Sequence, residues 1–358
     1  MEVIRNDEHI LTESSGGDRR LPNNIINVAV HDLRRTEAGF DIVPGRDELP
    51  VNPTTQRVVD DLHELYRRRS SKSHGRFSED QINYPTQTHL RAYVAGNPPD
   101  FPGLTSSLMT TLQVQARRRP NAAGGHVFFA HFECDGRQFL LVAIVNDKLG
   151  AALTRDLEVR EVRHLDMDGF RFAGRISLSG WAAGEQRYIG FLRGKGDVSE
   201  YFKEFLGCDT TVADRQDTLD LVAVIRQFAD DQGMEGADKD AFLGRAKAIC
   251  ERSSRNREEL EFEAFANELV PNDPVSLLDI LSDPDRGLND RFIPNRQALG
   301  SLVKFKARTS LWSVEFEREA LRGGNIVYDR EANSLTILNL PAALSAELQA
   351  ETDVDARD

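Results

Sequence analysis

The sequence has few cysteines and no long apolar run. Its 358 residues include three cysteines, at positions 134, 208 and 250, which are too far apart for the paired spacing of a zinc site or a redox motif. No run of eighteen apolar residues occurs, and the polar N-terminus lacks the basic start and apolar stretch of a signal peptide. We therefore expect reduced thiols, no membrane partner and a cytoplasmic location.

Motifs for common chemistries are also missing. There is no GxxxxGK[ST] phosphate loop, no GxSxG elbow, no zinc-finger spacing, no basic zipper and no clear helix-turn-helix. His126 and His131 lie five apart on a predicted strand, so they point to opposite faces and are expected to be structural. We predict no catalytic residue, no metal and no cofactor. A divalent-metal enzyme acting through Asp166 and Asp168 is kept as an alternative.

The net charge of −13 is unevenly distributed. Residues 209–285 hold 19 acidic and 8 basic side chains, a net of −11, so the rest of the chain is near neutral. Phosphate binding depends on the local potential, which decays over about 8–10 Å in physiological salt. A globally acidic protein can therefore still hold DNA on one face.

Basic residues gather in several short segments. Three arginines follow one another at 117–119, and residues 291–313 contain no Asp or Glu. The cluster after residue 66 is interpreted either as the solvated end of a helix or as a phosphate contact. The candidate DNA-binding residues are Arg67, Arg68, Arg69, Lys72, Arg76, Arg187, Arg193, Lys195, Lys304, Lys306 and Arg308.

The length predicts two domains, and the pattern of elements predicts an α+β protein. The first 23 residues are expected to form a mobile arm and residues 346–358 an acidic tail. Between them we predict an α+β domain at 24–195, with a mainly antiparallel sheet and flanking helices. A mainly helical domain at 196–345 is expected to be closed by a small C-terminal β-hairpin sheet.

Periodicity places the main elements of both halves. A helix is expected after Asn52-Pro53, another at 104–116, and HVFFAHFE and QFLLVAIV around an Asp-Gly turn predict a hairpin. Short strands are predicted at 25–30, 158–164, 169–176 and 187–192. Helices are predicted at 197–206, 211–232, 238–254, 258–269, 273–282 and near 295–304, followed by strands that include Trp312 to Phe316.

The order of several segments resembles the bacterial nucleoid-associated protein family of the NdpA/YejK type, over about Asn24 to Leu344. The segments are LHELYRRRSSKSHGRFSED, GGHVFFAHFECDGRQFLLVAIV, HLDMDGFRFAGRISLSGW, RYIGFLRGKGDVSEYFKEFLG and the terminal FKARTSLWSVEFEREALRGGNIVYDREANSLTIL. The resemblance implies a nucleoid location and binding of double-stranded DNA, with single-stranded DNA left open, and no catalysis or cofactor. The positions that match the family's segments are Lys72, Gly75, Arg187, Arg193 and Lys195.

Besides the divalent-metal enzyme acting through Asp166 and Asp168, two functions compete. The first is a largely sequence-independent DNA-binding protein whose basic residues meet phosphates. The second is an adaptor whose acidic segment 209–285 binds a basic surface of a DNA-processing enzyme, with phage defence as one setting. The sequence leaves homo-oligomerisation open.

Overall fold

The structure is a computed structural model that describes residues 22–97, 100–167, 169, 172–194, 200–210 and 214–355. For Lys306 and residues 352–355 it describes the backbone alone. Most of the expected N-terminal arm, the predicted site residue Lys195 and the alternative metal ligand Asp168 lie outside the described residues.

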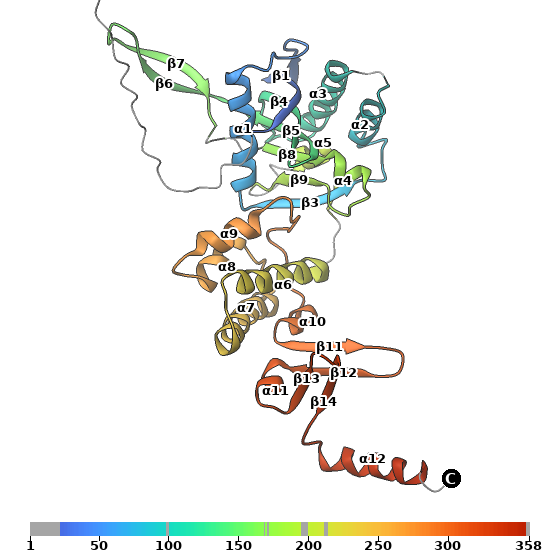
Figure 1. Cartoon of the computed structure of the whole chain (residues 1–358). Coiled ribbons are helices and arrows are strands. Elements are labelled where there is room, and N and C mark those ends of the chain that lie inside the picture. The colour runs from blue at the N-terminus through green and yellow to red at the C-terminus, as the bar shows by residue number, and fades with distance from the viewer. Residues whose placement is uncertain are drawn as a thin grey trace, which may run out of the picture.

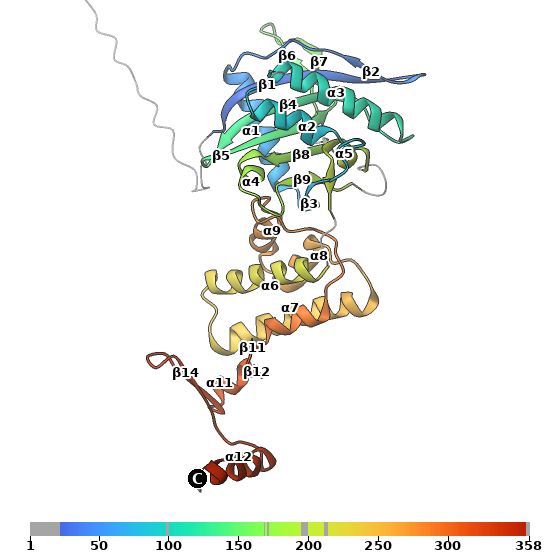
Figure 2. The same cartoon turned by 90° about the vertical axis from the view of Figure 1, so that its right-hand side faces the viewer.

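An eight-stranded antiparallel sheet forms the centre of the first part, residues 22–210 (Figures 1 and 2). Its strand order is β10-β3-β9-β8-β5-β4-β1-β2. The sheet curls as expected for antiparallel strands, and consecutive strands such as β4 and β5 are neighbours. The strands are β1 (Asn24–Thr36), β2 (Gly39–Val43), β3 (Lys72–Phe77), β4 (Gly125–Cys134), β5 (Arg137–Val145), β8 (Phe172–Ser177), β9 (Ile189–Leu192) and β10 (Cys208–Asp209).

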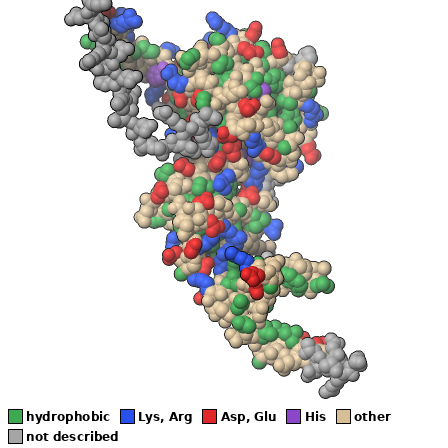
Figure 3. All heavy atoms as spheres, in the orientation of Figure 1, with side chains coloured by type: hydrophobic (Ala, Val, Ile, Leu, Met, Phe, Trp, Pro, Cys, Tyr) green, Lys and Arg blue, Asp and Glu red, His purple; other side chains and the backbone are tan. Residues whose placement is uncertain are grey.

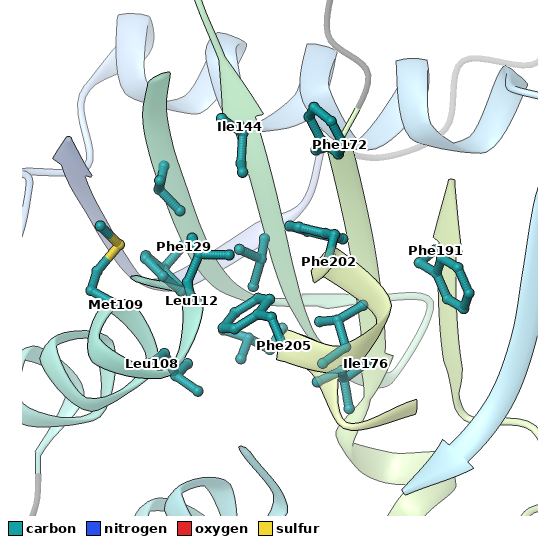
Figure 4. Close-up of a cluster of buried hydrophobic side chains, with 14 of the residues drawn as sticks. Leu108, Met109, Leu112, Phe129, Ile144, Phe172, Ile176, Phe191, Phe202 and Phe205 are labelled. Carbon is teal, nitrogen blue, oxygen red and sulfur yellow. The ribbon is translucent and has the colours of Figure 1, made fainter. Parts of the chain in front are cut away.

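Helices cover both faces of this sheet. Helix α1 (Pro53–Arg68) lies on one face, while α2 (Thr86–Val94), α3 (Phe101–Arg117) and α5 (Glu200–Leu206) cover the other, and the short α4 (Leu178–Ala182) follows β8. The larger core packs aromatic and aliphatic side chains of α3 and α5 against the strands (Figure 4). Alternate strand residues serve the two faces, so Phe129 joins this core and Phe128 joins the one under α1.

Local sequence explains the best-defined boundaries. The Asn52 side chain accepts hydrogen bonds from the backbone N–H groups of Thr54 and Thr55, which caps α1 just before Pro53. The turn of the β4–β5 hairpin contains Asp135 and Gly136 with φ of 51° and 73°, the left-handed conformation that such a pair favours. The predicted hairpin and the helices after Asn52 and around 104–116 are confirmed.

Two strands project from the sheet as a separate hairpin, β6 (Asp147–Leu153) and β7 (Val159–Leu165), called the ribbon below. Figure 1 shows the ribbon extending away from the body beyond the end of α1. Apart from Gly150, Thr154 and Leu165, every residue from 147 to 165 is exposed. The strand predicted at 158–164 is β7, whereas its partner β6 was not predicted.

The second part is helical, as expected. Helices α6 (Asp214–Asp231), α7 (Gly236–Asn256), α8 (Phe262–Leu269), α9 (Pro274–Ser282) and α10 (Arg296–Leu299), with a short 3-10 turn at Gly300–Leu302, enclose a second core. Phe228 and Phe242 stack there with ring centroids 5.8 Å apart. No side chain of the first part contributes to this core among the described residues.

The last elements leave the helical body (Figures 1 and 2). They are β11 (Lys304–Arg308), β12 (Ser313–Glu317), α11 (Arg318–Arg322), β13 (Ile326–Asp329), β14 (Ser334–Ile337) and α12 (Ala342–Asp355). We call residues 304–355 the C-terminal arm. The predicted fold class, an antiparallel sheet with helices followed by a helical part and C-terminal hairpins, is confirmed.

Two segments differ from the local expectations. Helix α1 ends at Arg68 within the basic cluster, as expected, but Lys72 of that cluster begins strand β3 inside the sheet, a strand that was not predicted. Helix α5, which the sequence analysis placed in the second half, buries Tyr201, Phe202 and Phe205 in the core of the first part. For α5 tertiary burial decides, because the apolar face of a short helix packs in the nearest available core. Strand β3 is instead held by its backbone pairing with β9 and β10.

Candidate nucleic-acid interface

The structure brings several predicted DNA-binding residues to the contact between the two parts, which we call the seam. The seam joins Arg67, Lys72, Arg175, Arg187 and Arg193 of the first part to acidic and backbone groups of the second part. Those groups come from α6, from Glu259 and from residues 282–291.

Lys72 is almost fully buried, at 1% exposure. Its ammonium donates to the backbone oxygens of Arg67 and Arg69 at the end of α1, and to the Ser282 oxygen at the end of α9, 2.8 Å away. Carbonyls at helix C-termini lack intrahelical donors and carry the negative end of the helix dipole. Burial lowers the pKa of Lys72 to about 7. The side chain therefore joins two helix ends.

Arg187 makes two close ion pairs across the seam. Its guanidinium lies 2.7 Å from Asp217 and 3.1 Å from Asp220, both on α6, and donates to the Gly287 oxygen at 2.8 Å. Asp217 is 3% exposed and also accepts from the Asn289 amide. Burial raises the pKa of Asp217 to about 6, against the opposing effect of Arg187. Near pH 7 the Arg187–Asp217 pair is therefore charged and buried.

Arg193 and Arg67 complete the row of contacts. Arg193 donates to the backbone oxygens of Asp290 and Arg291 at 3.2 and 2.9 Å and lies 3.3 Å from Glu259. Arg67 lies 3.7 Å from Asp283. The carboxylates involved belong to the acidic segment 209–285, so part of its charge faces the first part of the same chain.

Backbone contacts cover the outer edge of β3 at the seam. The His74 N–H donates to the Asn289 side chain at 2.6 Å, and the Asp290 N–H donates to the Lys72 oxygen at 3.0 Å. An open sheet edge exposes unpaired peptide groups that invite aggregation. Residues 289 and 290 therefore protect this edge as well as joining the two parts.

Arg175 is a seam residue that the sequence analysis missed. It is buried within β8, stacks on Phe139 at 4.3 Å and lies 2.5 Å from Asp285. Burial alone would raise the pKa of Asp285, but the Arg175 guanidinium lowers it. An arginine inside the apolar string FAGRIS was the available signal, because a buried charge requires a partner.

The basic residues at 304–308 lie next to acidic residues of the following strand, β12. In the β11–β12 register Lys304 faces Glu317 and Lys306 faces Glu315, and the Lys304 ammonium lies 3.2 Å from Glu315. Cross-strand partners share a face of the hairpin, so Lys304 lies beside glutamates of β12. The 291–313 stretch lacks acids in sequence, yet the fold supplies them.

The predicted residues that remain exposed are scattered. Arg68 pairs with Glu64 across one turn of α1, at 2.7 Å, a contact that contributes little on a surface. Arg69, Arg76 and Arg308 are exposed. At 117–119, Arg117 donates to the Phe40 oxygen and Arg119 lies 2.7 Å from Glu204. On the described face in Figure 3, basic and acidic side chains are intermixed.

The ribbon projects from the sheet and holds four Lys or Arg and four Asp or Glu over residues 147–165. Its register places Lys148 opposite His164 and Ala152 opposite Arg160, so these three basic side chains share one face with Gly150 and Val162. Leu149, Leu153 and Val159 lie on the other face, with Glu161. Arg155 lies in the connecting turn and Arg163 on the second face, both exposed.

Among the described residues, no group of three or more His, Cys, Asp and Glu side chains is placed to hold a metal ion. Asp166 accepts a hydrogen bond from the Gly169 N–H and lies 4.0 Å from the Lys148 ammonium. His126 contacts Asp32 at 2.5 Å and Asp147 at 3.2 Å, and His131 contacts the Tyr93 hydroxyl at 2.7 Å. Both histidines join elements of the fold.

The fold and its seam define an α+β protein in which an antiparallel-sheet part and an acidic helical part are joined through complementary charges. The chain belongs to the family described as nucleoid-associated protein YejK, whose model matches residues 29–345. The resemblance inferred from the order of segments is therefore confirmed. None of the described helices is long and apolar enough to cross a membrane.

Relatives named nucleoid-associated protein cover most of the chain. One from Pseudomonas fluorescens is 29% identical over 316 residues, 86% of this chain and 93% of its own. One from Pseudomonas aeruginosa is 29% identical over 333 residues, 91% of this chain and 97% of its own. One from Azotobacter vinelandii is 28% identical over 332 residues, 90% of this chain and 97% of its own. Together with the family match, they support a nucleoid-associated role.

Proposed function

We propose that the chain binds double-stranded DNA with little sequence preference and without catalysing a reaction on it, and that the ribbon makes the principal contact. The observation that carries this proposal is a projecting two-stranded element, one face of which carries Lys148, Arg160 and His164, on a member of a nucleoid-associated family. A major groove, about 12 Å wide, admits a two-stranded β-ribbon.

Side chains of the ribbon suit both backbone and groove. Lys148 and Arg160 have 55% and 69% of their side-chain surface exposed, and their neighbours Asp166 and Glu158 lie 4.0 and 3.4 Å away. Such exposed pairs contribute little and can exchange for phosphate. The apolar tip, formed by Leu153, Leu157 and Val159, resembles in chemistry the wedges with which architectural proteins contact base steps.

The residues predicted from sequence divide between two roles in this proposal. Arg68, Arg69, Arg76 and Arg308 are exposed and serve as additional phosphate contacts. Lys72 and the seam arginines hold the two parts together, because contact with phosphate would require them to leave buried partners.

Equilibrium binding to a fluorescent duplex and to its single strand, over a salt series with and without magnesium, tests this proposal. Each phosphate contact contributes about −0.9 to the slope of log affinity against log salt, so four ribbon contacts give about −3.6. The test variant replaces Lys148, Arg155, Arg160 and Arg163 with glutamine. The matched control replaces four exposed arginines elsewhere with glutamine: Arg57, Arg91, Arg215 and Arg255.

The ribbon variant should lose about 3.6 of the slope, together with the affinity that these contacts supply, while the control keeps more of both. No duplex binding by the unmodified protein at low salt would refute DNA binding itself. Full affinity and slope in the ribbon variant would refute the role of the ribbon. Turnover of plasmid DNA with magnesium or manganese above an Asp166→Ala control would refute the non-catalytic part.

Contacts within the chain weaken the hypothesis that the acidic segment 209–285 is an adaptor surface. Asp217, Asp220, Glu259 and Asp283 of the acidic segment face arginines of the same chain. A pull-down that recovers a DNA-processing enzyme with the intact chain, and loses it when exposed acids of α6 and α7 are neutralised, would restore that hypothesis.

A further inference from the structure

A glycine in the middle of the sheet leaves space for polar atoms beneath α1. Gly190 of β9 is paired with His74 of β3 on one side and with Arg175 of β8 on the other. Cross-strand partners point to the same face of a sheet, so the three residues form one row. Tyr66 of α1 covers this row. A Cβ at residue 190 would lie 2.4 Å from the Tyr66 hydroxyl oxygen and 2.9 Å from His74 Nε2, so both atoms face the place that glycine leaves open.

These polar atoms are buried without partners in the protein. Tyr66 is 0% and His74 is 4% exposed. Neither the Tyr66 hydroxyl nor either ring nitrogen of His74 has a hydrogen-bond partner among the described residues. Buried polar groups nearly always have a partner, because their lost hydration is otherwise uncompensated. They line a cavity of about 20 Å³ at the seam, which is room for one ligand about the size of a water molecule.

The charges around the cavity favour an anion. Three arginines line it, against two carboxylates: Arg137, Arg175 and Arg187, against Glu185 and Asp285. Glu185 lies 2.8 Å from Arg137, and Asp285 lies 2.5 Å from Arg175. The two carboxylates paired with Arg187, by contrast, do not line the cavity. One positive charge therefore remains among the lining residues.

His74 adds a hydrogen-bond donor without adding a charge. Burial lowers the pKa of His74 to about 3, although the Leu288 carbonyl opposes this shift. Three positive side chains act in the same direction as burial: Lys72, Arg175 and Arg187. The ring is therefore neutral at pH 7 and has one N–H group to donate. Where several positive charges act on one ring, a further cation is repelled and an anion is attracted.

We propose that this cavity binds a single small anion of the size of chloride. The anion accepts hydrogen bonds from the Tyr66 hydroxyl and a His74 N–H, and its charge is balanced by the arginines that line the cavity. A cavity of about 20 Å³ is too small for phosphate or an organic carboxylate. Chloride therefore stabilises the seam in addition to the ion pairs within the chain.

Unfolding of the full chain by urea, at constant ionic strength, tests this site when potassium chloride is exchanged for potassium gluconate. Gluconate has the same charge as chloride but is too large for the cavity. A ligand that binds only the folded chain increases the equilibrium constant for folding in proportion to its occupancy of the site. For a Kd of about 20 mM, raising chloride from about 5 to about 200 mM should increase that constant about ninefold.

The variant Tyr66→Phe removes one donor to the anion and keeps the ring. In chloride it should be less stable than the unmodified protein, and most of its chloride dependence should be lost. In gluconate it should be at least as stable, because it no longer buries an unpartnered hydroxyl. The matched control is Tyr93→Phe, which removes a hydroxyl that contacts Asn27 at 3.0 Å and His131 at 2.7 Å. The control should lose equal stability in both salts and keep the full chloride dependence.

Crystals grown in bromide locate the ion, because the anomalous signal of bromide should appear between Tyr66 and His74. An equal chloride dependence in Tyr66→Phe and the unmodified protein would overturn the proposal. A Tyr66→Phe deficit of the same size in both salts would also overturn it and would identify a water molecule in the cavity. A bromide signal without any chloride dependence would indicate an adventitious ion only. Since unfolding is measured without DNA, these results are independent of DNA binding by the ribbon.

Discussion

The buried ion pair between Arg187 and Asp217 predicts a clear separation of stability from DNA binding. Replacing Arg187 with methionine keeps much of the side-chain volume but leaves the Asp217 carboxylate, which is 3% exposed, with the Asn289 amide as its remaining close donor. Removing one partner of a buried pair costs about 3–5 kcal/mol. Because the amide remains, we expect a loss of about 3 kcal/mol in the free energy of unfolding.

The loss should depend on pH in a defined direction. Arg187 opposes the burial that raises the pKa of Asp217 to about 6, so its removal raises this pKa further. A carboxyl whose pKa is higher in the folded protein takes up a proton on folding as the pH falls. The penalty is therefore complete above the folded pKa and relieved below it. The deficit of Arg187→Met should be smaller at pH 5 than at pH 7.5.

Chemical denaturation at both pH values, followed by circular dichroism, measures this deficit. Arg57→Met is the control, because Arg57 is exposed on α1 and its loss should change stability by less than about 0.5 kcal/mol. Adding Asp217→Asn to Arg187→Met should recover part of the loss by removing the buried charge. A deficit no larger than that of the control would refute this account of the seam. So would a DNA salt slope reduced by about 0.9 with stability unchanged.

Two further substitutions test other contacts that hold elements of the fold together. Lys72→Met leaves the carbonyls at the ends of two helices without their donor, which costs about 1–3 kcal/mol for each buried group. The variant should therefore unfold at a lower denaturant concentration, and limited proteolysis should cut it at the seam. Equal denaturation midpoints for variant and unmodified protein would refute this role of Lys72. Burial opposes protonation of His126, but hydrogen bonds with Asp32 and Asp147 raise its pKa overall. Its stabilisation is therefore complete below about pH 6.5, the ordinary value, and is lost as the pH rises through the higher folded pKa. The melting temperature of His126→Gln should lie below that of the unmodified protein at pH 5.5 and approach it at pH 8.5; a constant difference would contradict this assignment.

Sequence periodicity predicted the long elements because each has a strong local signal. Helix α1 starts at an Asn-Pro cap, and the β4–β5 hairpin combines two apolar runs with an Asp-Gly turn. Strand β3 was missed because its string KSHGRF contains one apolar residue. Its polar side chains are buried by the seam, which no local pattern in the first part reveals.

The candidate site, too, was predicted only where the sequence gives a local signal. Counting charges located the basic clusters and the acidic segment correctly, but it could not show that they neutralise one another. Arg187 and Asp217 are 30 residues apart and Arg193 and Glu259 are 66 apart, so their pairing depends on the docking of the two parts. The ribbon was half predicted, because β6 contains Gly and Ala, which have low strand propensity.

We propose that DNA contacts the ribbon while the seam holds the two parts together. Hydrogen–deuterium exchange of the full chain, with and without a duplex, tests it most directly. We expect slower exchange at residues 147–165 on DNA binding and no change at 72–76 and 282–291. Protection at the seam, with the ribbon unchanged, would contradict it.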